Sequence, residues 1–390
     1  MYDVNHRYTF YLSCIYLYFY TSILRMLVKK FSILFLSVVI FFSGCKKDDC
    51  NCDCDLSTYN PTAYTVDRPQ GFPEMVIPAD NPMTVEGIAL GRKLFYEKRL
   101  SDDNTMSCAT CHAQQTFAFT DRGTRFSTGI DGITGTRNAM AIVNLGWAPR
   151  FFWDGRAFSL EEQALMPVTN PIEMHQRWSD AVSKLEADSV YPQLFLKAFG
   201  VCEIDSLVVA KAIAQFERTL ISGNSLFERY VNNNENVLPD PTSVLSGFSL
   251  FNRDKTITLS GGDCFHCHGA SGGLFTDNAF HNNGLDSVFT DVGLEAVTGS
   301  PNDRGKFKSP TLRNIELTAP YMHDGRFATL EEVIEHYNSG GHASATLDPL
   351  MKNVGVGLEL SQQDKTDLIN FLKSLTDMDY VNNPAFSDPH

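Results

Sequence analysis

Two short cysteine motifs carry the clearest chemical signal in this sequence of 390 residues. "CATCH" and "CFHCH" each place two cysteines three positions apart, with a histidine directly after the second cysteine. This is the attachment pattern of haem c, in which the thiols add to the haem vinyl groups and the adjacent imidazole ligates the iron. A zinc site would need four ligands, and neither motif has a second cysteine pair nearby. The sequence therefore predicts two haem c groups, held by Cys108, Cys111 and His112 and by Cys264, Cys267 and His268.

The sequence around these motifs is repeated. Residues 151–163, "FFWDGRAFSLEEQ", and residues 321–333, "YMHDGRFATLEEV", match at six of thirteen positions with a constant offset of 170. A repeat of this length indicates two copies of one domain, because a solenoid has a much shorter period. Apolar residues recur at helical spacing, as in 206–221, and no run shows sustained strand alternation. We therefore predict an all-α fold of two class I cytochrome c-like domains, 68–240 and 241–380.

The N-terminus is typical of an exported lipoprotein. Two lysines precede an apolar run that ends in "FSGC", which resembles the bacterial lipobox, whose cysteine is lipidated. We expect residues 1–44 to be a signal peptide, with Met26 as its natural start, and residues 45–67 to be a polar tether. The alternative is an uncleaved anchor helix, although the apolar run is short for a membrane span. In both cases the folded part is expected in the cell envelope, on the periplasmic side, and the first case anchors it to a membrane through lipidated Cys45.

The charge balance excludes one class of partner. The sequence has 32 Lys and Arg against 46 Asp and Glu, a net charge of −14. Loss of residues 1–44 removes four basic residues and one acid, which makes the net charge −17. Nucleic-acid binding needs clustered basic side chains and is not expected. An acidic surface suits a basic protein partner, and it suits equally a soluble surface without one.

Five longer stretches resemble the bacterial di-haem cytochrome c peroxidases and their relative MauG. They are "LGRKLFYEKRLSDDNTMSCATCH", "RNAMAIVN", "FFWDGRAFSLEEQALMPVTNPIEM", "CFHCH" and "SPTLRNIELTAPYMHDGRFATLEEVIEHY". They follow the order of the family and span about residues 86–340. The resemblance implies that His112 holds a peroxidatic haem in the first domain and that His268 holds an electron-transfer haem in the second.

The same resemblance implies three catalytic residues near the first haem. Glu173 matches the family's distal carboxylate, Gln163 a glutamine of the same pocket, and Trp153 the tryptophan between the two haems. A carboxylate over the iron can move the proton that cleavage of peroxide requires. Each residue also has a plain structural interpretation: a surface glutamate, a helix-face glutamine and a packed tryptophan.

Cofactor contacts follow from the resemblance as well. Arg156 and Arg326 each end a "DGR" and could pair with haem propionates, while pairing with a nearby aspartate is the open alternative. Asn138, Thr318 and Pro320 match positions that bind a calcium ion between the domains, the latter two through backbone carbonyls.

Two features depart from many members of the family. Residues 113–136 contain no histidine, whereas many members have a distal histidine there. We therefore expect the first iron to be open or water-bound and to react with peroxide without prior reduction.

At the offset of 170, Tyr337 falls opposite Pro167. Many members have a methionine ligand at the Tyr337 position, and MauG has a tyrosine. Tyr337 is the candidate sixth ligand of the second iron, and the alternatives that stay open are Met322, Met351, His336 and His342.

The resemblance implies an enzyme, a cytochrome-c peroxidase that reduces hydrogen peroxide with electrons from a cytochrome c or similar redox protein. A second reading is a MauG-like oxidase of a protein substrate, and a third is a di-haem electron-transfer cytochrome without catalysis. Two haem c groups and calcium are the expected cofactors. Besides peroxide and the electron donor, the membrane and a second copy of the chain in a homodimer are the expected partners.

Overall fold

The computed structural model describes residues 56–115, 117–121, 123–269 and 271–390. The predicted signal peptide and residues 45–55 of the predicted tether, Cys45 among them, lie outside these ranges. The described residues form helices joined by loops, with one antiparallel pair of two-residue strands, β1 (Phe280–His281) and β2 (Phe307–Lys308). The helical architecture expected from the sequence is confirmed. The α-helices are α2 (Val85–Phe95), α3 (Cys108–Cys111), α4 (Leu160–Thr169), α5 (Trp178–Glu186), α6 (Tyr191–Phe199), α7 (Ser206–Arg218), α8 (Leu226–Asn233), α9 (Pro241–Phe251), α10 (Glu295–Thr298), α11 (Leu330–Ser339), α12 (Gln362–Ser374) and α13 (Met378–Val381).

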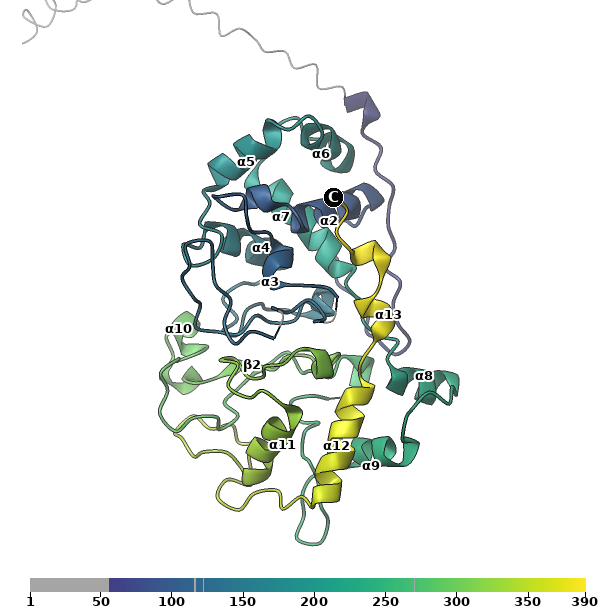
Figure 1. The fold of residues 1–390 in the computed structure, drawn as a ribbon, viewed down its shortest axis with the longest axis vertical. Coiled ribbons are helices and arrows are strands. Elements are labelled where there is room, and N and C mark those ends of the chain that lie inside the picture. Colours follow the sequence, from purple (N-terminus) through teal and green to yellow (C-terminus); the bar gives the residue numbers. More distant parts are fainter. Residues whose placement is uncertain (1–55, 116, 122, 270) are drawn as a thin grey trace, which may run out of the picture. The chain divides into compact units, whose positions relative to one another are not determined.

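Two pairs of helices form the frame of the fold. Helix α2 packs on α7, and α9 packs on α12 lower in the same view (Figure 1). Both pairs cross at a glycine. A Cβ on Gly91 of α2 would lie 1.8 Å from the carbonyl oxygen of Ala212, and one on Gly247 of α9 would lie 2.0 Å from that of Asp367. Because no side chain fits at either contact, the two backbones can approach closely only with glycine there.

The repeat seen in the sequence is also present in the backbone. Helices α4 and α11 are both ten residues long and begin at positions that differ by 170. Asn144 and Asn314, separated by the same offset, both adopt a left-handed conformation, with φ of 56° and 59°. The bridge between Phe151 and Ala157 recurs between residues 321 and 327. The segments before and within the two helices are therefore structural copies.

The hydrophobic cores draw on distant segments. Phe227 of α8, which precedes the predicted domain boundary, packs in the core of α9 and α12. Conversely, Tyr380 and Phe386, which follow α12 in the sequence, pack in a core with Phe95 and other residues of the first half of the chain. The Tyr380 hydroxyl also donates a hydrogen bond of 2.5 Å to the backbone oxygen of Ile142. Residues 56–390 form one compact unit as a result.

The described end of the predicted tether runs beside α2. The backbone nitrogen of Thr62 donates to a carboxylate oxygen of Glu86 at 2.7 Å, and that of Tyr64 donates to the backbone oxygen of Met83 at 3.0 Å. Among the helices that the structure describes, none is long and apolar enough to cross a bilayer.

Candidate functional site

The first cysteine motif opens onto a cavity of about 890 Å³. Helix α3 is a single turn, and it presents the free thiols of Cys108 and Cys111 to this cavity. His112 follows the turn, and its Nδ1 lies 3.0 Å from the backbone oxygen of Phe119. Because a carbonyl oxygen only accepts, Nδ1 carries the proton and Nε2 keeps a free lone pair. Burial lowers the pKa of His112, so its imidazole is neutral at pH 7, as a metal ligand must be.

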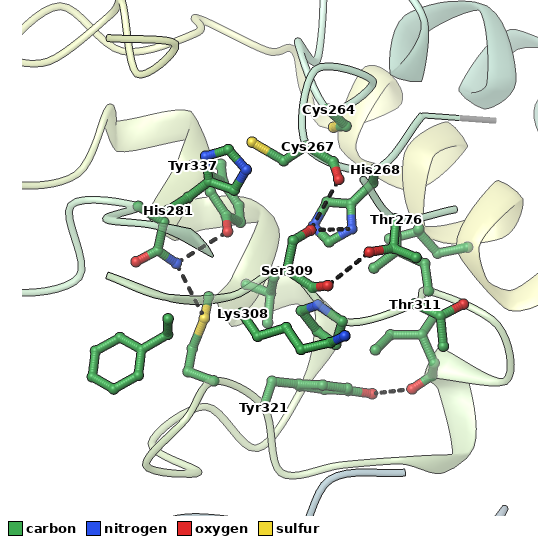
Figure 2. Close-up of a pocket in the computed structure, with 18 of the residues that line it drawn as sticks. Cys264, Cys267, His268, Thr276, His281, Lys308, Ser309, Thr311, Tyr321 and Tyr337 are labelled. Carbon is green, nitrogen blue, oxygen red and sulfur yellow. Dashed lines mark hydrogen bonds between the residues drawn. The ribbon is translucent and has the colours of Figure 1, made fainter. Parts of the chain in front are cut away.

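The second motif repeats this arrangement in a cavity of about 270 Å³ (Figure 2). The thiols of Cys264 and Cys267 are free and lie beside His268. The Nδ1 of His268 lies 3.3 Å from the backbone oxygen of Phe275, seven residues further on, as in the first motif. Burial lowers the pKa of His268 to about 4.

Both cavities therefore fit haem c. Each offers two free thiols and one neutral imidazole whose remaining nitrogen is available to a metal. A carbonyl that fixes the tautomer and the ring orientation is the usual support of a ligating histidine. Burial raises the pKa of the Cys108 thiol to about 12 and that of Cys111 to about 11. Thiols in such a setting stay neutral, which suits an apolar prosthetic group better than a metal held by thiolates.

Two of the predicted catalytic residues, Glu173 and Gln163, lie in the first cavity together with Pro167. Glu173, Gln163 and Pro167 all line it, the latter two from α4 and Glu173 from the turn that follows. Asn170 donates a hydrogen bond of 2.7 Å to the Glu173 carboxylate and so holds it in place. Burial raises the pKa of Glu173 above its usual range, while the Asn170 bond and the charge of Arg156 oppose that rise. The carboxyl is thus well placed to exchange a proton inside the cavity.

One histidine besides His112 lines the first cavity among the described residues, namely His323. Its ring stacks on that of Phe307, with centroids 3.6 Å apart and planes inclined by 10°. Burial lowers the pKa of His323, so the stacked ring is neutral at pH 7. Its backbone oxygen accepts a hydrogen bond of 2.8 Å from Asn138. No motif in the sequence assigns His323 a role, and the structure shows a packed side chain.

Trp153 lies between the two cavities and lines both. Its indole nitrogen donates to the backbone oxygen of Asn138 at 2.8 Å, and its own backbone oxygen accepts from the nitrogen of Lys308 at 2.8 Å. Lys308 lines both cavities as well. The Lys308 ammonium donates hydrogen bonds to the backbone oxygen of Arg150 and to the side-chain oxygen of Asn278. Burial lowers the pKa of Lys308 to about 8. A buried lysine at this position was not identified from the sequence, since a single lysine carries no pattern.

Tyr337 lines the second cavity together with Met322 and Met351. Asn283 donates a hydrogen bond of 3.1 Å to the Tyr337 hydroxyl, and the same amide nitrogen lies 3.5 Å from the sulfur of Met322 (Figure 2). Burial raises the pKa of Tyr337 to about 12. His336 instead points its Nε2 at the backbone oxygen of Asn283, at 3.1 Å. Neither His336 nor His342 is among the described residues that line this cavity.

The two arginines of the repeat form ion pairs with aspartates. The guanidinium of Arg156 lies 3.0 Å from Asp154, and that of Arg326 lies 2.9 Å from Asp324 and 2.8 Å from Asp286. Both arginines also line the first cavity. The structure therefore shows the aspartate pairing, one of the two alternatives, and the pairing with haem propionates stays a prediction.

The three residues predicted to bind calcium converge on the second cavity. Asn138, Thr318 and Pro320 all line it. The Asn138 side-chain nitrogen donates to the backbone oxygens of Thr124 and Arg125, both at 3.1 Å. Within the described residues, no hydrogen bond reaches the Asn138 side-chain oxygen or the backbone oxygens of Thr318 and Pro320.

Comparisons with known proteins agree with this geometry. A family model described as di-haem cytochrome c peroxidase matches residues 85–236. The methylamine utilization protein MauG of Methylorubrum extorquens is 38% identical over 321 residues, which cover 79% of this chain and 82% of that protein. Cytochrome-c peroxidase IdrP1 of a Pseudomonas species is 33% identical over 337 residues, with 78% and 84% covered. The crystal structure of a MauG-like protein associated with microbial copper homeostasis superposes with a TM-score of 0.75 and 37% identity, and covers 84% of this chain and 99% of that one.

Proposed function

Because this chain belongs to the di-haem cytochrome c peroxidase and MauG family, we propose that it reduces hydrogen peroxide to water with electrons from a cytochrome c or similar carrier. Each turnover would take two electrons and two protons and release two water molecules. Haem c, when bound, supplies the redox chemistry. The observation that carries the proposal is the partly buried carboxyl of Glu173 in the cavity of the first cysteine motif. A cytochrome that only carries electrons has no use for a proton-exchanging group there.

In this proposal Glu173 moves one proton across the peroxide. It takes the proton from one oxygen and returns it to the other, which can then leave as water. The hydrogen bond from Asn170 fixes the direction of the carboxylate, and Gln163 in the same cavity can orient the peroxide by hydrogen bonding. Pro167 has no side-chain donor, so α4 leaves the space beside it to the substrate.

The second cavity would receive the electrons. His268 and Tyr337 are the proposed ligands of its haem iron, as His112 is of the first. Trp153 is the proposed relay, because it lines both cavities and is held from both sides by Asn138 and Lys308. An anionic tyrosine oxygen is expected to give the second haem a lower potential than a methionine would.

The remaining parts of the proposal concern domains, calcium and location. Residues 68–240 and 241–380 would each be a class I cytochrome c domain, which the two glycine-crossed helix pairs support. Calcium would bind Asn138 and the carbonyls of Thr318 and Pro320, whose oxygens accept no hydrogen bond within the described part of the chain. The protein would act in the periplasm.

A MauG-like oxidase of a protein substrate is the second candidate. In that function, oxidising equivalents from peroxide would reach aromatic residues of a partner protein. Two observations favour it: a tyrosine, not a methionine, sits at position 337, and residues 113–136 supply no histidine that could close the first cavity.

Steady-state consumption of peroxide by the holoprotein tests the proposal. The assay compares wild type, Glu173→Gln and the control Glu203→Gln, with and without a reduced cytochrome c. Glu203 is exposed and far from the motifs in sequence, so its substitution should leave turnover unchanged. A peroxidase predicts turnover that depends on the electron donor and falls by about 100-fold or more in Glu173→Gln alone.

Other results would redirect the assignment. Slow turnover with a long-lived oxidised species after addition of peroxide would favour the MauG-like oxidase. Absence of any reaction with peroxide would contradict both enzymatic functions and leave an electron-transfer cytochrome. An equal loss of peroxide turnover in Glu173→Gln and Glu203→Gln would contradict the role assigned to Glu173.

A further inference from the structure

Three side chains that could hold a metal ion lie at the second cysteine motif and on the loop that leads into it, two of them at the wall of the second cavity. Asp254 follows α9, Asp263 precedes Cys264, and His266 stands between the two cysteines of the motif. One ligand atom from each of these three residues lies within 4.8 Å of the other two. None of the three has a part in the peroxide chemistry proposed above.

Two atoms of this group are buried without a hydrogen bond. The Asp263 Oδ1 and the His266 Nδ1 lie 2.6 Å apart, yet neither has a hydrogen-bond partner in the described structure. The two atoms are close but not aligned for an N–H···O bond. The side chain of Asp263 is only 8% exposed, so water does not readily replace the missing partner. The close contact of these two atoms without a hydrogen bond leaves a buried acceptor unsatisfied, and a cation shared by both atoms would satisfy them.

Asp254 closes the group on its solvent side. Its carboxylate oxygen lies 3.8 Å from the Nε2 of His266, and its side chain is 48% exposed. Lys352 neutralises part of the acidic charge, with its ammonium 2.8 Å from Asp254 and 3.9 Å from Asp263. The Lys352 side chain is 47% exposed, so it can swing into water and leave the carboxylates to an ion. The group is therefore accessible from solvent.

We propose that Asp254, Asp263 and His266 form a binding site for a divalent transition-metal ion of the Zn²⁺ type. One imidazole nitrogen and two carboxylate oxygens are ligands that such ions accept, and water would complete a tetrahedron. Tetrahedral zinc ligands at about 2.0–2.2 Å from the metal are about 3.3 Å apart, so small side-chain movements would close the site. An oxygen-only cation such as calcium would not use the imidazole. The ion would tie the loop of residues 254–263 to the second cysteine motif through His266.

Zinc binding to the holoprotein tests this inference directly. The protein, with both haems attached, is dialysed against excess calcium so that the predicted calcium site is filled, and is then titrated with zinc chloride. Metal content is read by elemental analysis and affinity by calorimetry. Wild type should bind one more equivalent of zinc than His266→Gln or Asp263→Asn, or should bind it more than about 10-fold more tightly. Lys352→Met should bind zinc more tightly than wild type, because the competing ammonium is gone.

His175→Gln serves as the matched control. His175 also pairs with an aspartate, Asp131, at 2.6 Å, but both side chains are about half exposed and offer no third ligand. Its substitution should not change zinc binding. Equal zinc content and affinity in wild type, His266→Gln and Asp263→Asn would overturn the proposal, as would the absence of bound zinc in wild type. Haem content and thermal unfolding of each variant show that a lost equivalent reflects the ligands and not a misfolded chain.

Discussion

Replacing Asn283 by leucine tests the proposed role of Tyr337 without removing the tyrosine itself. Asn283 donates a hydrogen bond of 3.1 Å to the Tyr337 hydroxyl at the wall of the second cavity. If this oxygen ligates the second haem iron, it carries negative charge, and the amide stabilises that charge. The stabilisation matters most in the reduced state, in which the iron withdraws less charge from the oxygen. Leucine is similar in size to asparagine but cannot donate, so the reduced state should lose stability and the potential should fall.

The size of the shift follows from the hydrogen bond. A hydrogen bond to a charged acceptor contributes about 1.5–3 kcal/mol. For a one-electron couple a tenfold change in the equilibrium constant, about 1.4 kcal/mol, corresponds to 59 mV. If the whole bond acted in the reduced state alone, the potential of the second haem would fall by about 60–130 mV. This range is the upper bound, because the oxidised state benefits from the bond to a lesser degree.

A spectroelectrochemical titration of the holoprotein measures the shift. Asn283→Leu is compared in the wild-type background and in a Tyr337→Phe background, where the substitution should have no effect. Met322→Leu is a needed control, because the Asn283 amide also lies 3.5 Å from the Met322 sulfur. An unchanged potential in Asn283→Leu would refute the reasoning. So would an equal shift in the Tyr337→Phe background, since the amide would then act on something other than the phenolic oxygen.

Three further predictions concern pH and stability. Turnover of peroxide should fall as the pH drops through the pKa of Glu173, which burial holds above its usual range, and Glu173→Gln should lack this pH dependence in the same steady-state assay. Gly91→Ala should lower the free energy of unfolding in urea by roughly 3 kcal/mol or more, because the added Cβ would lie 1.8 Å from the Ala212 backbone oxygen. Gly135→Ala is the control and should be nearly neutral, because the nearest atom to its added Cβ is 3.6 Å away. Burial raises the pKa of Glu217 from 4.5 to about 8, so its ionisation should cost stability increasingly as the pH rises from 4.5 through about 8. Glu217→Gln should therefore stabilise the protein against urea at pH 8 and leave it unchanged near pH 4, and an equal effect at both values would contradict the assignment.

The sequence was most informative where spacing alone carries the signal. The offset of 170 predicted that residues around Tyr337 copy those around Pro167, and α4 and α11 begin at matching positions. The resemblance made Tyr337 a candidate ligand at the second motif, and Tyr337 does line the second cavity. The motifs likewise placed His112 and His268 where a backbone carbonyl orients each ring. Ligation of iron by Tyr337 stays a prediction.

Other features depend on contacts that no local pattern encodes. Asn283 and Lys308 reach the two cavities from loops whose course is set by tertiary packing, and a single asparagine or lysine has no periodicity to detect. The group of Asp254, Asp263 and His266 forms only because a loop of ten residues folds back on the second motif. The predicted domain boundary lies between residues 240 and 241, after α8. Phe227 of α8 nevertheless packs in the core formed by α9 and α12. Hydrophobic residues near a boundary do not reveal which core they join.

The packing of residues 378–386 sets the order in which the chain can mature. Tyr380 and Phe386 contact Phe119, the residue whose carbonyl orients His112. A chain that emerges from the ribosome or a translocon therefore cannot complete the packing around Phe119 until about 270 further residues have followed His112. The core beside the first cysteine motif is in this sense completed by residues far along the chain from the motif itself.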